Sequence, residues 1–374
     1  MAGKKHTESF AEYKTRLIDP ISDSYCAAKW LNATIWLGNG QTTSCHHPLG
    51  HQIDAGELIT NPSAIHNTPH KKYMRKLMQE GKRPQECEYC WKIEDIGRDN
   101  ISDRVYKTAV FDEEHILATA QADWQENTML KTLEISFDRT CNFACSYCNP
   151  SFSTTWVKDI HKYGPYRNIN GDARSHFINE ADHAKPLPDD INPYSQAFWR
   201  WWEQPNGLAD NLEEIRITGG EPLMSGYTWQ LIDWFRKNQG KSSTRLAINS
   251  NLGTEVDIGR LLDSTRDMAI DLYTSNESMG LQAEYIRDGL DVEQWERTVR
   301  LVSKMFNVPI RVMVTFGLLS VFNFKTFIKK VIELRNDGVD IMFNCARLVD
   351  PKQFDLRILP DYANKYFEDT NTFI

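Results

Sequence analysis

Cysteines carry the clearest chemical signal in this 374-residue sequence, and seven of the eight fall into two groups. Cys141, Cys145 and Cys148 lie close together, and an aromatic residue, Tyr147, directly precedes the last of them. Three thiolates leave one coordination position open, both at a tetrahedral zinc ion and in a cubane iron–sulfur cluster. Because an open iron can bind a substrate, the triplet predicts a catalytic metal centre. The alternatives are a zinc knuckle and an accidental triplet.

A second motif follows the predicted strand at residues 214–218. Its glycines allow the backbone to approach a ligand closely, and its carboxylate can pair with an ammonium group. Taken alone, the motif could be an ordinary turn. Its members are Gly219, Gly220, Glu221 and Pro222.

Polar residues also follow the next two predicted strands. Ser250 and Asn251 come after the strand at 245–249, where a Ser-Asn turn that closes the strand is an equal alternative. Arg287 comes after the strand at 268–273, and a surface ion pair is its alternative role. Ligands of parallel α/β proteins gather at the carboxyl ends of strands, so these groups are expected to share one pocket.

Together these motifs resemble the signature of radical S-adenosylmethionine (SAM) enzymes. The resemblance implies that Cys141, Cys145 and Cys148 hold a 4Fe-4S cluster whose open iron chelates the amino and carboxylate groups of SAM. Cleavage of SAM would give a 5'-deoxyadenosyl radical that abstracts hydrogen from a substrate. Tyr147 would then flank the adenine. The groups that would orient the methionine and ribose parts are Gly219, Gly220, Glu221, Pro222, Ser250, Asn251 and, as in some relatives, Arg287.

Strands and helices alternate after the triplet, which predicts a parallel α/β sheet. The predicted strands cover residues 133–137, 214–218, 245–249, 268–273, 309–315 and 339–344, and the predicted helices cover 227–238, 291–305 and 323–335. The resemblance implies a partial (β/α)6 TIM-like barrel over 131–350, with an insertion at 150–212 and a tail at 351–374. The aromatic run at 198–202 in that insertion favours an amphipathic helix packed on the core over a substrate-stacking surface.

The other four clustered cysteines precede the barrel. Cys26, Cys45 and the pair Cys87 and Cys90 resemble, in their spacing, the opening of SPASM and twitch modules. The resemblance implies a small N-terminal auxiliary-cluster domain at 1–110, joined by a linker at 111–130, whose four thiolates hold a second 4Fe-4S cluster that carries electrons. Structural zinc is the alternative. His46 and His47 could join such a site, but hydrogen-bonding loop residues are the favoured interpretation.

Two further features are interpreted as structural. The segment 70–78 has apolar residues at helical spacing, and its basic face is expected to lie in solvent rather than to receive an acidic peptide or a phosphate. Cys345 follows the sixth strand and is expected to be buried, with a thiol that faces substrate as the minority alternative.

Composition limits the partners. The net charge of −8 argues against a generally basic nucleic-acid binder. The sequence contains no apolar run near the roughly 20 residues of a membrane span and no signal peptide, so a cytoplasmic protein is expected.

The family implies an external one-electron donor such as flavodoxin or ferredoxin. The substrate is expected to be a peptide or protein side chain, with a small molecule such as a sugar, amine or nucleoside as the alternative and a non-enzymatic zinc scaffold as a remote one.

Overall fold

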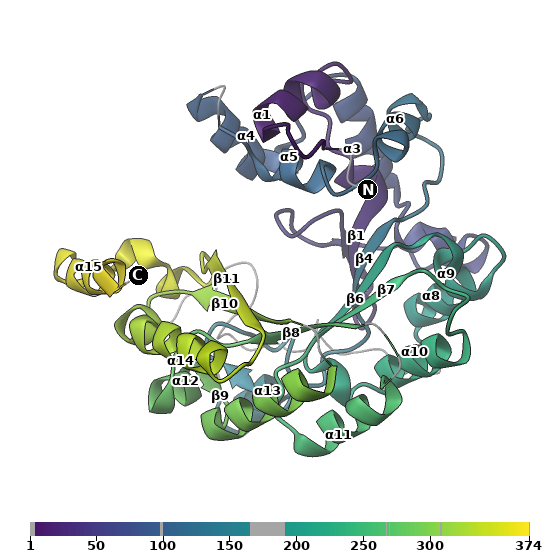
Figure 1. Cartoon of the computed structure of the whole chain (residues 1–374). Helices are drawn as coiled ribbons and strands as arrows, with labels where there is room; N and C mark the ends of the chain where they lie inside the picture. Colours follow the sequence, from purple (N-terminus) through teal and green to yellow (C-terminus); the bar gives the residue numbers. More distant parts are fainter. Residues whose placement is uncertain are drawn as a thin grey trace. The chain divides into compact units, whose positions relative to one another are not determined.

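The computed structural model describes residues 4–97, 100–164, 191–266, 268, 270–306 and 309–373 (Figure 1). The chain divides into two compact units. Unit 1 comprises Met1–Ile135 and Leu187–Ile215, and unit 2 comprises Ser136–Pro186 and Arg216–Ile374. The four N-terminal cysteines therefore belong to unit 1, whereas the cysteine triplet and the polar strand ends belong to unit 2.

Unit 2 contains a mixed α/β arrangement with a parallel sheet whose neighbouring strands run in the order β11-β10-β8-β7-β6. Alternating burial along β10 shows why these segments form strands, because its branched residues point to one face. Parallel pairing joins β7 to β8, β8 to β10 and β10 to β11. The strands are β6 (Glu214–Thr218), β7 (Arg245–Asn249), β8 (Ile270–Ser275), β10 (Ile310–Phe316) and β11 (Ile341–Arg347), and β5 (Ala144–Cys145) pairs separately with β9 (Arg287–Asp288).

Helices line one face of this sheet in Figure 1, where α10, α11, α13 and α14 follow one another along the strands. On α13 the residues Trp295, Val299 and Val302 are buried, and the Asp291 carboxylate accepts a hydrogen bond from the Gln294 amide at 2.8 Å, which caps the helix. The helices of unit 2 are α7 (Thr154–Tyr163), α10 (Gly226–Lys237), α11 (Glu255–Ser264), α12 (Gly280–Ile286), α13 (Val292–Phe306), α14 (Phe324–Asn336) and α15 (Asn364–Phe373).

The predicted strands and helices agree with these elements to within a few residues. The largest strand differences lie at the fourth strand, where β8 begins at Ile270 rather than Met268, and at the sixth, where β11 continues to Arg347. Ala269 of the predicted fourth strand lies outside the described residues, as do 165–190 of the predicted insertion. The parallel α/β class is confirmed, whereas closure of the sheet into a partial barrel stays a prediction.

Unit 1 contains a small sheet and many short helices. Its strands are β1 (Asn32–Trp36), β2 (Gln41–Thr43), β3 (His51–Gln52) and β4 (Thr132–Ser136), of which β1, β2 and β3 pair antiparallel in that order. Its helices are α1 (Phe10–Tyr13), α2 (Ala28–Leu31), α3 (Pro69–Gln79), α4 (Glu88–Ile96), α5 (Asp103–Thr108), α6 (Glu113–Gln121), α8 (Pro193–Glu203) and α9 (Leu208–Asn211). Their apolar core includes the thiols of Cys26, Cys87 and Cys90.

The aromatic run at 198–202 lies on α8, as predicted for an amphipathic core helix. Phe198, Trp201 and Trp202 have no exposed surface, and Arg200 on the opposite face donates to the carbonyl of Ile59 at 3.0 Å. The run therefore builds the interior of unit 1.

The solvated basic face predicted for 70–78 is wrong. On α3 the side chains of Lys71 and Arg75 are buried, while Tyr73 is half exposed. Arg75 is accommodated because its guanidinium donates to the Lys29 carbonyl and to the Asn67 side chain, both at 3.0 Å. Hydrogen bonds thus bring two basic side chains of α3 into the interior, next to the buried Met78 of the apolar face.

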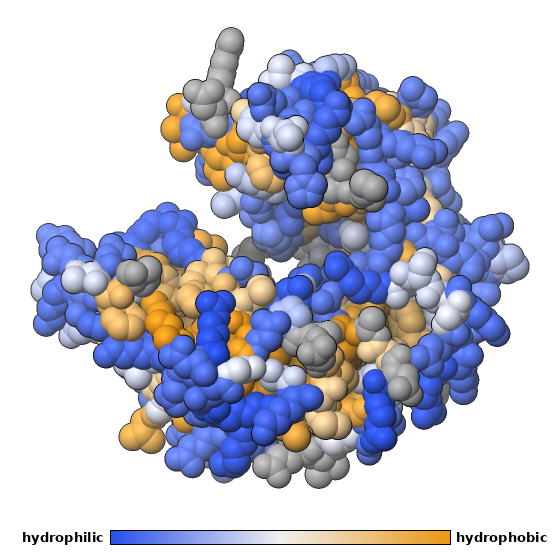
Figure 2. Space-filling model, in the orientation of Figure 1, coloured by the Kyte–Doolittle hydropathy of each residue, from blue (hydrophilic) through white to orange (hydrophobic). Residues whose placement is uncertain are grey.

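Polar side chains, drawn in blue, cover most of the face shown in Figure 2, and apolar side chains gather in its lower part. Among the described residues, no helix has both the length and the apolar character that crossing a membrane requires.

Candidate functional site

The cysteine triplet of unit 2 occupies a loop after β4. Cys145 ends β5 and pairs with Arg287 of β9, and the Cys148 amide donates to the Cys145 carbonyl at 2.9 Å. All three thiols are free and partly buried. The loop therefore holds three unbonded sulfur donors in a defined backbone path.

The first turn of α7 supports this loop. The hydroxyl of Ser153 donates to the Phe143 carbonyl at 2.6 Å, and that of Thr155 donates to the Cys141 carbonyl at 2.7 Å. The Trp156 indole donates to the Cys145 carbonyl at 2.9 Å. Sequence analysis assigned no role to these residues, although a Ser-Thr-Thr run before an apolar helix indicates a helix N-terminus.

Burial raises the pKa of all three thiols. The pKa of Cys145 rises to about 12, because burial outweighs the nearby Arg287 guanidinium. Burial likewise raises the pKa of Cys141 and of Cys148. Without a metal these groups stay protonated at neutral pH, and a bound cation would supply the positive charge that favours thiolates.

Gly219 and Gly220 pass close to the backbone that leads into the triplet. A Cβ on Gly220 would lie 2.3 Å from the Thr140 carbonyl oxygen, and one on Gly219, whose φ is +131°, would lie 2.8 Å from that of Asp138. The Glu221 amide also donates to the Thr140 carbonyl at 2.7 Å. The glycines are therefore required for contact between the Gly219–Pro222 loop and the cysteine loop.

Glu221 joins this loop to the end of β7. Its carboxylate accepts hydrogen bonds from the Ser250 hydroxyl at 2.8 Å, the Asn251 amide at 2.7 Å and the Leu223 amide at 3.1 Å. Only 3% of Glu221 is exposed. Burial raises its pKa to about 7, although the three hydrogen bonds favour the charged form.

Asn251 also connects the end of β7 to the cysteine loop. Its side-chain amide donates to the Asn142 side chain, inside the cysteine triplet, at 2.8 Å. The structure thus brings together Glu221, Ser250 and Asn251 beside the cysteine loop. Pro222 is buried and begins a short 3-10 helix at Pro222–Met224.

Arg287 forms a buried ion pair with Glu277, which follows β8. The guanidinium approaches the carboxylate at 2.7 and 3.0 Å, and both side chains are less than a tenth exposed. The Arg287 guanidinium lies 5.5 Å from the centre of the Tyr147 ring and 4.0 Å from the Cys145 sulfur. Sequence analysis missed Glu277, although its position just beyond a strand end was a usable signal.

A small hollow lies beside this group, lined by Tyr147, Glu277 and Thr315 among other residues. Burial raises the pKa of Tyr147, so the phenol stays protonated. Its hydroxyl faces both carboxylate oxygens of Glu277 at 3.4 Å.

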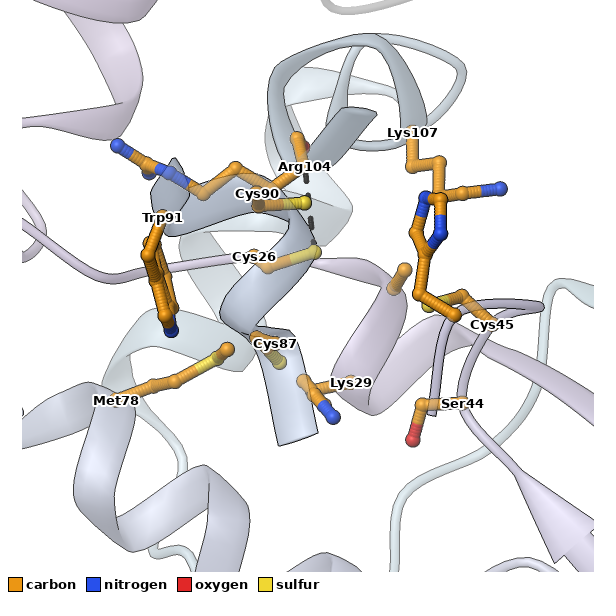
Figure 3. Close-up of a pocket in the computed structure, with 12 residues that line it drawn as sticks. Cys26, Lys29, Ser44, Cys45, Met78, Cys87, Cys90, Trp91, Arg104 and Lys107 are labelled. Carbon is orange, nitrogen blue, oxygen red and sulfur yellow. Dashed lines mark hydrogen bonds between the residues drawn. The ribbon is translucent and has the colours of Figure 1, made fainter. Parts of the chain in front are cut away.

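In unit 1, the four N-terminal cysteines line one cavity. Figure 3 shows Cys26, Cys87 and Cys90 on one side of the space and Cys45 across from them. Cys26 precedes α2, Cys45 follows β2, Cys87 ends a 3-10 helix just before α4, and Cys90 lies in the first turn of α4. Burial raises the pKa of Cys87 and of Cys90 to about 12. Residues far apart in sequence therefore converge on one thiol-lined space.

The four sulfurs spread more widely than a single zinc ion requires. Around tetrahedral zinc, thiolate sulfurs lie about 3.8 Å apart. Among the described residues, no three of the cysteine sulfurs lie within 4.8 Å of one another, and the one group of potential ligands that compact is His46, His47 and Asp103. The structure therefore does not gather these thiols into the compact set that one zinc ion takes.

His46 and His47 are hydrogen-bonded to Asp103, at 3.4 and 2.8 Å from one carboxylate oxygen. The Lys107 ammonium, which can only donate, lies 3.2 Å from Nδ1 of His46, so a neutral His46 keeps its proton on Nε2 and donates it to Asp103. This arrangement agrees with the interpretation of both histidines as hydrogen-bonding loop residues.

The expected burial of Cys345 is wrong. Its side chain is exposed on β11, where only Ile341 is buried. Because β11 ends the strand order of its sheet, β10 is its one neighbour, and this edge position explains the exposure.

No family model and no curated protein matches this sequence. A crystal structure of Streptococcus suis SuiB is similar at 12% identity and a TM-score of 0.40, covering 81% of this chain and 62% of SuiB. The structure of Streptococcus suis SuiB bound to S-adenosylmethionine is similar at 13% identity and a TM-score of 0.40, covering 90% and 68%. This chain thus spans less than two thirds of the first of these structures. A TM-score of 0.40 is too low for either similarity to support a conclusion about this chain.

Proposed function

We propose that this protein is a radical SAM enzyme. One observation carries the proposal: the Glu221 carboxylate and the Asn251 side chain connect the Gly219–Pro222 loop and the end of β7 to the loop that bears the three free thiols. An ordinary turn or an accidental cysteine triplet would not require three separate segments to meet through buried polar groups.

The residues fit the cofactors. Cys141, Cys145 and Cys148 would hold a 4Fe-4S cluster that, when bound, supplies the electron for reductive cleavage of SAM to a 5'-deoxyadenosyl radical. Glu221 fixes Ser250 and Asn251, and its remaining acceptor sites can take the ammonium of a methionine group. The ion pair of Glu277 and Arg287 holds Tyr147 beside the loop. Together these groups orient the ligand and limit the access of water.

The second part of the proposal is an auxiliary 4Fe-4S cluster on Cys26, Cys45, Cys87 and Cys90 in unit 1. Its support is the shared cavity that the four thiols line. Full thiolate ligation suits an electron carrier rather than a substrate-binding metal. An external one-electron donor such as flavodoxin or ferredoxin would complete the cycle.

The proposed reaction is hydrogen abstraction from a peptide or protein side chain, with a small molecule as the alternative substrate. Transfer of deuterium from a labelled candidate substrate into 5'-deoxyadenosine distinguishes them. Label that arrives from peptides but from no sugar, amine or nucleoside supports the first class, and the reverse result supports the second.

Iron content after anaerobic reconstitution tests both cluster assignments. The wild-type chain is expected to bind about eight irons, and serine replacement of either cysteine group is expected to leave about four. Cys345→Ser is the matched control and keeps about eight. Four irons together with one zinc ion in the wild-type protein would refute the auxiliary cluster alone, whereas a triplet variant that keeps all its iron would refute the catalytic one.

A further inference from the structure

A lysine ammonium faces the four-thiol cavity of unit 1. Lys29 belongs to α2, is 2% exposed, and lines the same cavity as the cysteines. Figure 3 shows its side chain between Cys87 and Ser44. The ammonium of Lys29 forms an ion pair with the Glu86 carboxylate, which favours its charged form. Lys29 therefore stays charged beside the thiols.

The counter-charge of Lys29 is the carboxylate of Glu86. Glu86 pairs with the Lys29 ammonium and with Nε2 of His70, the latter at 2.5 Å. Glu86 is not among the residues that line the cavity, so the positive end of this pair faces the sulfurs.

The other cations that line the cavity differ from Lys29. Arg104 is held by Glu94 through two charge-assisted hydrogen bonds of 2.6 and 2.8 Å, which neutralise it. Lys107 is only partly buried and interacts with His46. Lys29 and Arg104 are thus the two buried cations that line the cavity, and Figure 3 shows Lys29 beside Cys87.

Two more cations lie in the same interior. Lys71 and Arg75 are 1% and 0% exposed, and across the described part of the chain neither has a carboxylate within salt-bridge distance. Lys71 donates to the Thr42 hydroxyl at 2.8 Å, and Arg75 is bound by neutral groups. Burial, together with the charges of Arg75 and Lys29, lowers the pKa of Lys71.

Buried cations without counter-charge are costly, commonly by several kcal/mol each. A centre with four thiolate ligands carries net negative charge, and it would supply the anion that this interior lacks. Reduction adds one further electron to that centre, taken from the external donor, and a nearby ammonium favours the more negative state.

We propose that Lys29, backed by Arg75, is a built-in counter-charge that stabilises the four-thiolate centre of unit 1 and raises its reduction potential. This inference rests on the proposed auxiliary cluster. It assigns Lys29 the role of a residue that tunes the potential of that cluster without coordinating it.

Potentiometric titration of the auxiliary cluster, followed by electron paramagnetic resonance, tests the inference in a protein whose triplet is replaced by serine. Lys29→Met is expected to lower the ratio of reduced to oxidised cluster at a fixed potential by at least tenfold, which is 59 mV for a one-electron couple. Lys29→Arg keeps the charge and should change the ratio less than threefold. The matched control is Lys92→Met on α4, whose side chain is 70% exposed, and it should leave the ratio unchanged within twofold.

Three outcomes overturn the inference: an unchanged ratio in Lys29→Met, an equal shift in Lys92→Met, or a wild-type unit 1 that binds no cluster. The third also removes the proposed auxiliary cluster, so iron content separates the two failures.

A second variant guards against failure of Lys29→Met to fold. Lys29→Gln removes the charge but keeps a polar group beside Glu86, so it is expected to narrow the gap in Tm between the reconstituted and metal-free forms. A gap equal to that of wild type would contradict the counter-charge.

Discussion

Glu221 shows how one buried carboxyl can organise a site. Its oxygens accept hydrogen bonds from two strand ends, yet burial still raises its pKa to about 7 from an ordinary value of 4.5. Because the folded-state pKa is the higher one, this contribution to stability is complete below about pH 4.5 and is lost as the pH rises through about 7.

Glu221→Gln tests this linkage in the metal-free protein. Between about pH 4.5 and about pH 8, wild type is expected to lose about 3 kcal/mol of unfolding free energy relative to the variant. Urea unfolding at both pH values measures the difference. Parallel pH profiles for the two proteins would show that Glu221 titrates as it does in water.

The ion pair of Glu277 and Arg287 gives a second prediction for single residues. Glu277→Gln leaves a buried guanidinium without its partner and is expected to cost about 3 to 5 kcal/mol. The double variant Glu277→Leu with Arg287→Met should cost less than that single change, because it removes both charges. Urea unfolding of the single and double variants measures the difference. If the cost of the double variant equals the sum of the costs of its two single substitutions, the pair is not coupled.

A substitution at a glycine tests how closely the Gly219–Pro222 loop packs against the cysteine loop. Gly220→Ala would place a Cβ 2.3 Å from the Thr140 carbonyl oxygen, so the Gly219–Pro222 loop must move away from the cysteine loop. The expected result is a loss of roughly 2 kcal/mol of stability and weaker SAM binding in calorimetry.

Gly259→Ala in α11 is the matched control, because a Cβ there meets no atom within 4 Å. It should stabilise the protein by up to about 1 kcal/mol and leave SAM binding unchanged. Equal effects of the two alanines would contradict the close contact of the loops.

Elements were the more predictable part of this chain. Alternating residues identify β10, and a 3.6-residue period identifies α13, because burial of one face dictates both patterns. The sequence predicted that the site lies at the ends of several strands. It did not predict which residues hold the site in place. Ser153 acts through the Phe143 carbonyl, and Glu277 acts through Arg287 and the distant Tyr147, contacts that no local pattern predicts. The burial of Lys71 depends on Thr42 and His66, which no local pattern connects to it.

At the scale of the whole molecule, the two cysteine groups lie in separate compact units. Their proposed roles should therefore separate. Serine replacement of Cys26, Cys45, Cys87 and Cys90 is expected to keep reductive SAM cleavage by dithionite and to abolish modification of substrate. Product analysis by mass spectrometry checks both. Full modification by this variant would refute a role for the auxiliary cluster.

The central claim is that three thiols leave one iron free to bind SAM. Its most direct test is chromatographic measurement of 5'-deoxyadenosine after the reconstituted protein, SAM and dithionite are mixed without oxygen. We predict formation of 5'-deoxyadenosine together with methionine by wild type, and none by the variant in which Cys141, Cys145 and Cys148 are serine. Equal yields from both proteins, or no cleavage by wild type that carries its full iron, would contradict the assignment.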